Sequence, residues 1–285
     1  MRKRTDAAQF RRGRVGTTLE RPRDVGAAAL SRRRSDLPDF VQTHADIDAL
    51  AHEIFSRYVG EQKILIEGAP YATTFFRADY CQDFRVMRLA GEMALAVNRR
   101  AARDQASEDG VAPLRVSIPE IMLAALLHDL GKHHEDCAPF LELLKDKDLR
   151  GDSALETARR EHLLGIVRDV HCRKGPCMID RLRDAGRPEL GSAFLATVAR
   201  RHGDDYNVNC GAKLGCWWAR EINVVTIADD YDAMTSEGPE RAYKPKNITA
   251  RDAARLLLQG AERGRYEPEI ATIFVEDVLG SSVAG

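Results

Sequence analysis

Hydrophobic residues recur at intervals of three and four positions along most of the chain between about residues 37 and 280. Between Tyr80 and Arg103 the apolar side chains that share one helical face are Val86, Leu89, Ala90, Met93 and Val97. Similar spacing predicts helices over residues 153–172, 188–202, 216–236, 249–260 and 267–279. Because no sustained alternation and no hairpin signal is found, the sequence predicts an all-α domain over residues 36–285.

Local signals place some of the helix boundaries. The Asp-Leu-Pro sequence at residues 36–38 predicts the start of a first helix that runs to Phe55. The short apolar stretch at residues 63–66 predicts a loop or a strand fragment. Ser-Ile-Pro-Glu at residues 117–120 has the pattern of a capping box, with proline in the first turn. We expect this helix to be strongly apolar and to end at Gly131.

The composition excludes a membrane-spanning chain. Of the 285 residues, 44% are hydrophobic and 31% are charged. The longest uninterrupted apolar run is residues 121–127, seven residues, whereas a membrane helix needs about 20. We therefore expect no membrane insertion and, since no secretory signal opens the chain, a cytoplasmic location.

The formal net charge of −1 conceals an uneven distribution of charge. Residues 1–34 hold eleven basic and three acidic side chains, a net charge of +8. The other residues hold 32 basic and 41 acidic side chains, a net charge of −9. Residues 1–35 show no apolar period, so the sequence predicts a disordered Arg-rich tail there. A nucleic-acid-binding arm and an organellar transit peptide are alternative interpretations of the same composition.

The six cysteines do not have the Cys-x2-Cys spacing of structural zinc sites. Free thiols are the expected state in a reduced compartment. A zinc site that uses His171, Cys172 and Cys177 is the alternative. The sequence leaves both a monomer and a homodimer open.

His128 and Asp129 lie side by side at the end of the most apolar predicted helix. Burial of an ionisable pair is costly unless another group compensates for it. A divalent metal ion would do so, since imidazole nitrogen and carboxylate oxygen are suitable ligands and a carboxylate can bridge two ions. Lys132, just after Gly131, could hold a phosphate group as a point charge.

Three further candidate ligands lie on later predicted helices. His162 and His202 belong to helical patterns, and Asp229 follows an apolar stretch at residues 222–227. Any one of these residues alone is more often an ordinary core or surface group. Their occurrence together with the His-Asp pair predicts one shared site.

These motifs resemble the HD superfamily of metal-dependent phosphohydrolases, and its HD-GYP branch in particular. The string His-Asp-Leu-Gly-Lys at residues 128–132 matches the signature of the family. His162 with Gly165 matches its next ligand helix, and Ala-Asp-Asp-Tyr-Asp-Ala-Met-Thr-Ser at residues 228–236 matches its late motif. Arg241 falls where the branch has Arg-Pro-Tyr-Arg.

The resemblance covers about residues 78–280 and includes three departures from the family pattern. Gln82 stands where the family has its first histidine ligand. Arg201 and His202 stand in place of a His-His pair. Residues 204–211 replace the Gly-Tyr-Pro loop, which in the family helps to form the cyclic di-GMP site.

The resemblance implies an HD-domain helical bundle with metal-dependent phosphodiesterase or phosphohydrolase activity on a nucleotide-type phosphoester. Cyclic di-GMP is the first expected substrate. One or two divalent ions are implied, iron or manganese before magnesium or nickel. The implied metal ligands are His128, Asp129, His162, His202 and Asp229. Asp129 and Lys132 are the expected catalytic residues, and the expected supporting or substrate-binding residues are Gln82, Asp232, Arg201 and Arg241.

The departures at Gln82 and Arg201 favour a second hypothesis of a different class. In this hypothesis the chain is a degenerate HD domain that binds a ligand or a partner without turnover. Metal analysis together with a phosphodiesterase assay separates the two hypotheses.

Overall fold

The structure is a computed structural model, and it describes a part of the chain that is almost entirely helical. The described ranges are 43–67, 72–104, 110–144, 153–211, 218–236 and 248–280, without the side chains of residues 59–81. No strand occurs within these ranges, so the all-α prediction is confirmed. The predicted tail at residues 1–35 and Arg241 lie outside the described residues. None of the described helices has the length and apolar character to cross a membrane.

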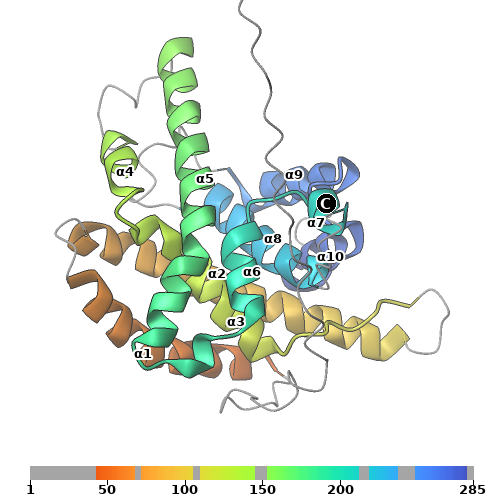
Figure 1. Cartoon of the computed structure of the whole chain (residues 1–285). Helices are drawn as coiled ribbons and strands as arrows, with labels where there is room; N and C mark the ends of the chain where they lie inside the picture. The colour runs from red at the N-terminus through yellow and green to blue at the C-terminus, as the bar shows by residue number, and fades with distance from the viewer. Residues whose placement is uncertain are drawn as a thin grey trace, which may run out of the picture. The chain divides into compact units, whose positions relative to one another are not determined.

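Residues 35–285 form one compact unit, and its helices are drawn in Figure 1. The first five helices are α1 (His44–Glu67), α2 (Ala72–Asp104), α3 (Ile118–Leu127), α4 (Ala138–Leu144) and α5 (Ala154–Asp184). The next five are α6 (Ala193–Arg201), α7 (Tyr206–Gly211), α8 (Ala219–Thr235), α9 (Ala250–Glu262) and α10 (Pro268–Ile273). Short 3-10 turns follow α3 at Leu130–His133 and precede α6 at Pro188–Leu190, and a π-helical turn at Phe274–Val278 follows α10.

The helix α3 lies at the centre of the core. Every residue of α3 except Glu120 is buried, and the helix packs against α1, α2, α6 and α8 (Figure 1). Such an apolar helix is stable only when other helices cover it on all sides. Its C-terminal end therefore opens into the interior of the bundle rather than into solvent.

The expected N-cap and first-turn proline of α3 are confirmed, whereas the Glu120 carboxylate has a different partner from the one expected in a capping box. Ser117 is the N-cap residue, and its hydroxyl oxygen accepts a hydrogen bond from the backbone N–H of Glu120. The Glu120 carboxylate accepts a hydrogen bond of 2.6 Å from the hydroxyl of Ser192, which is itself the N-cap of α6. The two helix starts are thereby joined.

The end of α3 differs from the expectation. The helix ends at Leu127, and Gly131 lies inside the following 3-10 turn with a negative φ. A Cβ atom at Gly131 would clash with the backbone carbonyl oxygen of His171 on α5. Gly131 is thus required by the close approach of two backbones and not by helix termination.

Two other local expectations need correction. Residues 63–66 belong to α1 and form neither a loop nor a strand, because the helix continues to Glu67. The long helix α5 begins at a capping box of Ser153 and Glu156, but it continues to Asp184, well beyond residue 172. His171 therefore lies in the middle of a continuous helix. The expected first-helix start at residues 36–38 lies outside the described residues.

Candidate metal centre

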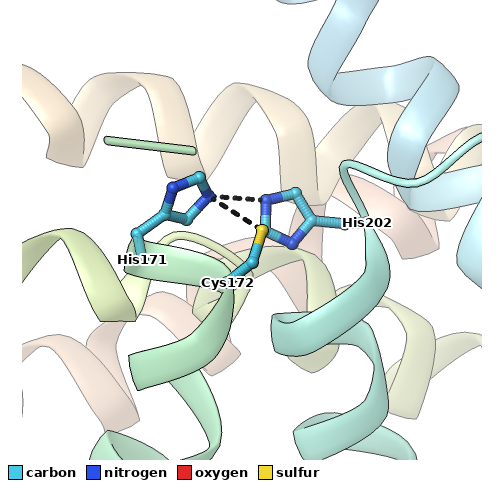
Figure 2. A group of neighbouring side chains, drawn as sticks. All are labelled: His171, Cys172 and His202. Atoms are coloured by element: carbon cyan, nitrogen blue, oxygen red, sulfur yellow. Dashed lines mark hydrogen bonds between the residues drawn. The ribbon is translucent and has the colours of Figure 1, made fainter. Parts of the chain in front are cut away.

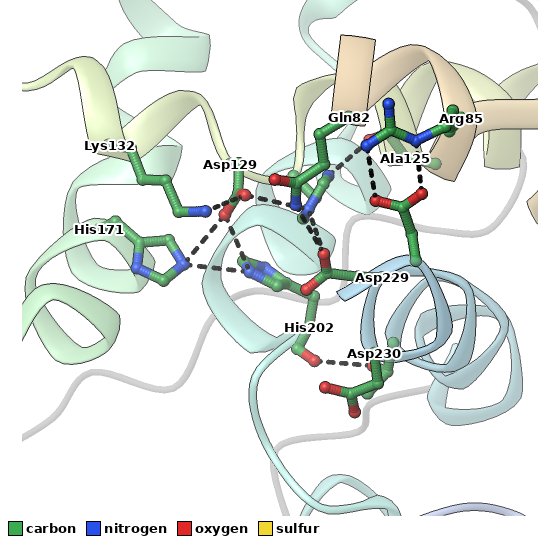
Figure 3. Close-up of polar contacts among 12 residues, drawn as sticks. Gln82, Arg85, Ala125, Asp129, Lys132, His171, His202, Asp229 and Asp230 are labelled. Carbon is green, nitrogen blue, oxygen red and sulfur yellow. Dashed lines mark hydrogen bonds and ion pairs between the residues drawn. The ribbon is translucent and has the colours of Figure 1, made fainter. Parts of the chain in front are cut away.

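Five helices bring polar side chains to one buried place at the C-terminal end of α3 (Figure 3). The contributing residues are Gln82 of α2, His128 and Asp129 at the end of α3, His171 of α5, His202 at the end of α6 and Asp229 of α8. All of them are buried except Asp229, which is about one quarter exposed. Concentration of this many ionisable groups in a core is costly unless a bound cation compensates for it.

The Asp129 carboxylate is the centre of the cluster. Its Oδ2 atom lies 3.3 Å from His128 Nε2, and its Oδ1 atom lies 3.3 Å from His171 Nε2 and 3.7 Å from His202 Nε2. Lys132 Nζ forms an ion pair with Oδ2. The two oxygens of one carboxylate thus face different histidines, which is the arrangement needed to bridge two cations.

Each of the three histidines is held by its Nδ1 atom. A backbone carbonyl can only accept a hydrogen bond, so the Nδ1 atom must carry the proton, and in a neutral ring Nε2 presents its lone pair. Histidines that bind metal are oriented in the same way. The three bonds are His128 Nδ1 to Ala125 O at 2.6 Å, His171 Nδ1 to Val167 O at 2.8 Å and His202 Nδ1 to Val198 O at 3.0 Å.

The Nε2 atoms of the three histidines lie close together, and in neutral rings their lone pairs lack hydrogen-bond donors. His171 Nε2 and His202 Nε2 are 3.1 Å apart, and in neutral rings both would present lone pairs to each other. The buried His128 Nε2 has no hydrogen-bond partner in the described part of the chain. Such nitrogens need either an added proton or a metal ion, so the donor set fits a metal.

Asp229 completes the cluster from α8. Its Oδ1 atom lies 3.5 Å from His128 Nε2 and accepts a hydrogen bond of 3.0 Å from the amide Nε2 of Gln82. Gln82 thus positions a carboxylate that faces the centre. One turn further along both helices, Asp232 accepts hydrogen bonds from Arg85 at 2.6 and 3.2 Å. This second pair joins α2 to α8.

The electrostatics favour ionised carboxylates and a neutral His171. Burial raises the pKa of the Asp129 carboxyl, but Lys132 and His128 outweigh this effect and hold the pKa well below its ordinary value. Burial also opposes ionisation of Asp229, and contact with His128 lowers its pKa below the usual range. Burial lowers the pKa of His171 to about 4, so that its ring is neutral at pH 7.

The two carboxylates also affect the pKa of His128. Burial lowers its pKa, but the carboxylates of Asp129 and Asp229 outweigh the burial and raise the pKa well above its ordinary value. A proton on His128 would balance part of the charge of the two carboxylates, as a divalent ion would. Metal binding would release this proton.

The structure does not bring His162 into the cluster. This residue is exposed on α5, nine positions before His171, which corresponds to about 14 Å along the helix axis. His171 occupies the place expected for His162. A signal for His171 was present in the sequence, since Gly175 follows one helical turn later on the same face. A Cβ at Gly175 would lie 2.9 Å from Ala199 Cβ, so this is the face that packs against α6.

Of the other residues expected at the site, Lys132 lies at the ligand cluster and Arg201 does not. Arg201 donates a hydrogen bond of 3.2 Å to Asn209 Oδ1 and so connects α6 to α7. The end of α6 is fixed by Thr226 of α8, whose hydroxyl donates to the carbonyl oxygen of His202 at 2.7 Å. Arg201 therefore supports the helix that carries His202 and does not face the ligands.

A cavity of about 370 Å³ lies in front of the cluster. Its polar end holds the candidate metal ligands, and three cationic side chains line it: Lys132, Arg168 and Arg265. Its apolar wall comes from α4 and α5 and consists of Leu141, Leu144, Leu164 and Val167. A lining that combines cationic and apolar side chains, with Glu161 and Asp230 as further acidic members, suits a small molecule that carries both an anionic and an apolar group.

Cys172 lies beside the histidines, as Figure 2 shows. Its Sγ atom is 3.5 Å from His171 Nε2. Burial, followed by the charge of Asp129, raises the pKa of the Cys172 thiol to about 12, so it stays protonated without a metal. Cys177 is exposed and is not part of this group. The zinc site considered from the sequence had Cys177 as its third residue, whereas the group in the structure has His202.

Comparison of this chain with protein-family models, with curated proteins and with solved structures found no match. The geometry itself shows a His/Asp group, His128, Asp129 and His202, that could hold a metal ion. It also shows a second group, His171, Cys172 and His202, with the same capacity.

Proposed function

We propose that this protein is a metal-dependent phosphohydrolase that acts on a nucleotide-type phosphoester, with cyclic di-GMP as the first substrate to test. The proposal is carried by one observation. Three buried histidines, each held through Nδ1, direct their Nε2 atoms toward the two oxygens of one buried carboxylate, Asp129. The sequence resemblance to the HD superfamily agrees with this arrangement.

We infer two metal positions that share Asp129, and the two groups whose donor atoms lie within 4.8 Å of one another, His128–Asp129–His202 and His171–Cys172–His202, support the presence of a metal. His128, Asp129 and Asp229 would hold one ion, with Gln82 orienting Asp229. Asp129, His171 and His202 would hold a second ion. Mixed imidazole and carboxylate donors suit iron and manganese, with magnesium or nickel as further candidates.

The protein residues supply charge and position for the hydrolysis. When bound, the ions supply Lewis-acid catalysis and lower the pKa of water. Asp129 would be a ligand of the bound metal, and Lys132 adds a positive charge beside it. This local charge stabilises the negative charge that develops on the phosphoryl oxygens. It also offsets the net charge of −9 on the rest of the domain, which would repel a polyanion.

The cavity supports a phosphoester of nucleotide type. Arg168 lines the cavity and can bind phosphate oxygens, whereas Arg265 is held by Asp230 and Asp205, and the leucines of α4 and α5 offer an apolar wall to a base. A volume of about 370 Å³ is near the lower end of ligand pockets, which favours one nucleotide unit at a time.

The test is the Asp129→Asn variant of the full chain. The wild-type protein and the variant are loaded anaerobically with iron or manganese and assayed against cyclic di-GMP and a generic phosphodiester. We expect the variant to lose both metal retention and turnover while its circular dichroism spectrum is unchanged. Asp169→Asn, on the exposed face of α5, is the control and should retain both. Full activity of Asp129→Asn would refute the assignment.

A binding module without turnover is the second candidate function, and the Gln82 contact favours it. Gln82 provides an amide where the resembling family has a histidine, and this amide is engaged by Asp229. In that case the metal-loaded protein binds a cyclic dinucleotide in calorimetry but releases no hydrolysis product. A protein that takes up no metal and stays inert toward cyclic dinucleotides and generic phosphoesters under anaerobic iron or manganese would exclude the enzyme.

A further inference from the structure

The sulfur of Cys172 lies at the His171–His202 pair, and the proposed function does not use it. One atom from each of His171, Cys172 and His202 lies within 4.8 Å of the other two. Figure 2 shows dashed lines from His171 Nε2 to both the Cys172 sulfur and His202 Nε2. The sulfur also packs close to Gly203, where an added Cβ would be 3.6 Å from it. The Cys172 side chain therefore lies between its own helix, α5, and the end of α6.

The distances fit a shared ion. A tetrahedral ion with metal–sulfur bonds of about 2.3 Å and metal–nitrogen bonds of about 2.0 Å separates sulfur from nitrogen by about 3.5 Å and two nitrogens by about 3.3 Å. The observed separations are 3.5 Å from Cys172 Sγ to His171 Nε2 and 3.1 Å between the two Nε2 atoms. The two histidines are nine-tenths or more buried, and their lone pairs face each other.

We propose that Cys172 is a thiolate ligand of the ion held by His171 and His202, and that this position selects a thiophilic ion, zinc or ferrous iron, over magnesium and manganese. The inference rests on the metal cluster of the proposed function and assigns it a sulfur ligand. Coordination forms a metal–sulfur bond and breaks the S–H bond, and the proton leaves to solvent without any change of oxidation state.

This ligand makes the two metal positions chemically different. The position at His128, Asp129 and Asp229 has nitrogen and oxygen donors, which also suit manganese and magnesium. The position at His171 and His202 gains a soft donor, which magnesium and manganese bind poorly. The protein would thus hold two different ions rather than a matched pair.

The experiment uses cobalt(II) alone as a spectroscopic probe. The full chain is freed of metal by chelation and titrated with cobalt(II), and binding is measured by equilibrium dialysis. We expect a thiolate-to-cobalt charge-transfer band in the near ultraviolet that is lost in Cys172→Ser and retained in Cys177→Ser, the exposed thiol five residues further along α5. Zinc affinity should fall by about tenfold or more in Cys172→Ser, whereas manganese affinity stays unchanged.

The outcomes separate this inference from the proposed function. Cobalt binding without the band, or a band that persists in Cys172→Ser, overturns the sulfur ligand alone. The absence of any cobalt binding overturns both the ligand and the metal cluster. A cobalt band in a protein that hydrolyses no phosphoester supports the ligand and contradicts the proposed function. If Cys172→Ser does not fold, X-ray absorption of the zinc-loaded wild type decides, since a sulfur ligand appears at about 2.3 Å.

Discussion

At the residue scale, the choice between two histidines on one helix decides the composition of the site. His162 and His171 are nine positions apart on α5, which is two and a half helical turns, so they point to opposite sides of the helix. Only His171 faces Asp129 and His202. The sequence motif at residues 162–165 therefore points to the right helix but to the wrong face.

We expect His171→Ala to lower metal affinity by about tenfold or more, because it removes a nitrogen donor that faces Asp129. His162→Ala is the matched control on the same helix and should bind metal like the wild type. Metal titration and elemental analysis of the purified variants provide the measurement. Loss of metal in His162→Ala, with His171→Ala unaffected, would reverse the assignment.

Arg168 offers a second prediction at this scale. Arg168 lines the cavity, and no ion pair with a carboxylate of the described residues is found for it, so it is available to an anion. We expect Arg168→Ala to raise KM for a phosphoester by about tenfold and to leave kcat nearly unchanged, because it removes binding that is equal in the ground and transition states. Arg173→Ala, which breaks only an exposed pair with Asp169, should leave KM unchanged. An equal KM in both variants would contradict the prediction.

At the scale of the elements, close backbone approaches place α5 against the end of α3. Gly131 lies against the carbonyl oxygen of His171, and Gly175 lies against Ala199 of α6. These contacts bring His171 within reach of Asp129 and His202. The position of α5 is thus part of the site geometry.

We expect Gly131→Ala to destabilise the fold by about 1–3 kcal/mol, since its Cβ would meet backbone atoms that cannot rotate away. Metal affinity should fall as well, because α5 has to shift. Gly165→Ala is the control on α5, where a Cβ meets nothing within 4 Å, and it should stabilise the helix by about 0.5–1 kcal/mol. Urea unfolding curves measure both changes, and equal effects of the two variants would refute this packing argument.

At the scale of the whole molecule, the charge is divided between residues 1–34 and the rest of the chain. The first part has a net charge of +8 and the remainder −9. Residues 35–285 form a compact unit by themselves, with a continuous hydrophobic core that runs from α1 to α10. Metal binding and folding should therefore not depend on the N-terminal residues. A nucleic-acid-binding role of these residues and a homodimer both stay as hypotheses.

We expect a chain that lacks residues 1–35 to unfold at the same midpoint temperature and to bind the same amount of metal as the full chain. If the basic residues bind nucleic acid, the full chain shows an affinity that falls steeply with salt and the shortened chain does not. Thermal unfolding and a salt titration of binding to a labelled oligonucleotide test these statements. A lower midpoint temperature after deletion would contradict the first of them.

The sequence by itself determined the helical class, the capped start of α3 and the His-Asp pair at its end. These features depend on hydrophobic periodicity and on residues that are neighbours in the sequence, so the sequence alone is enough to predict them. Only the tertiary structure decided that His171 replaces His162, that Gly131 serves a backbone contact and that Gln82 faces Asp229. These features depend on the rotation of each helix about its axis and on contacts between residues up to 147 positions apart, which local patterns do not encode.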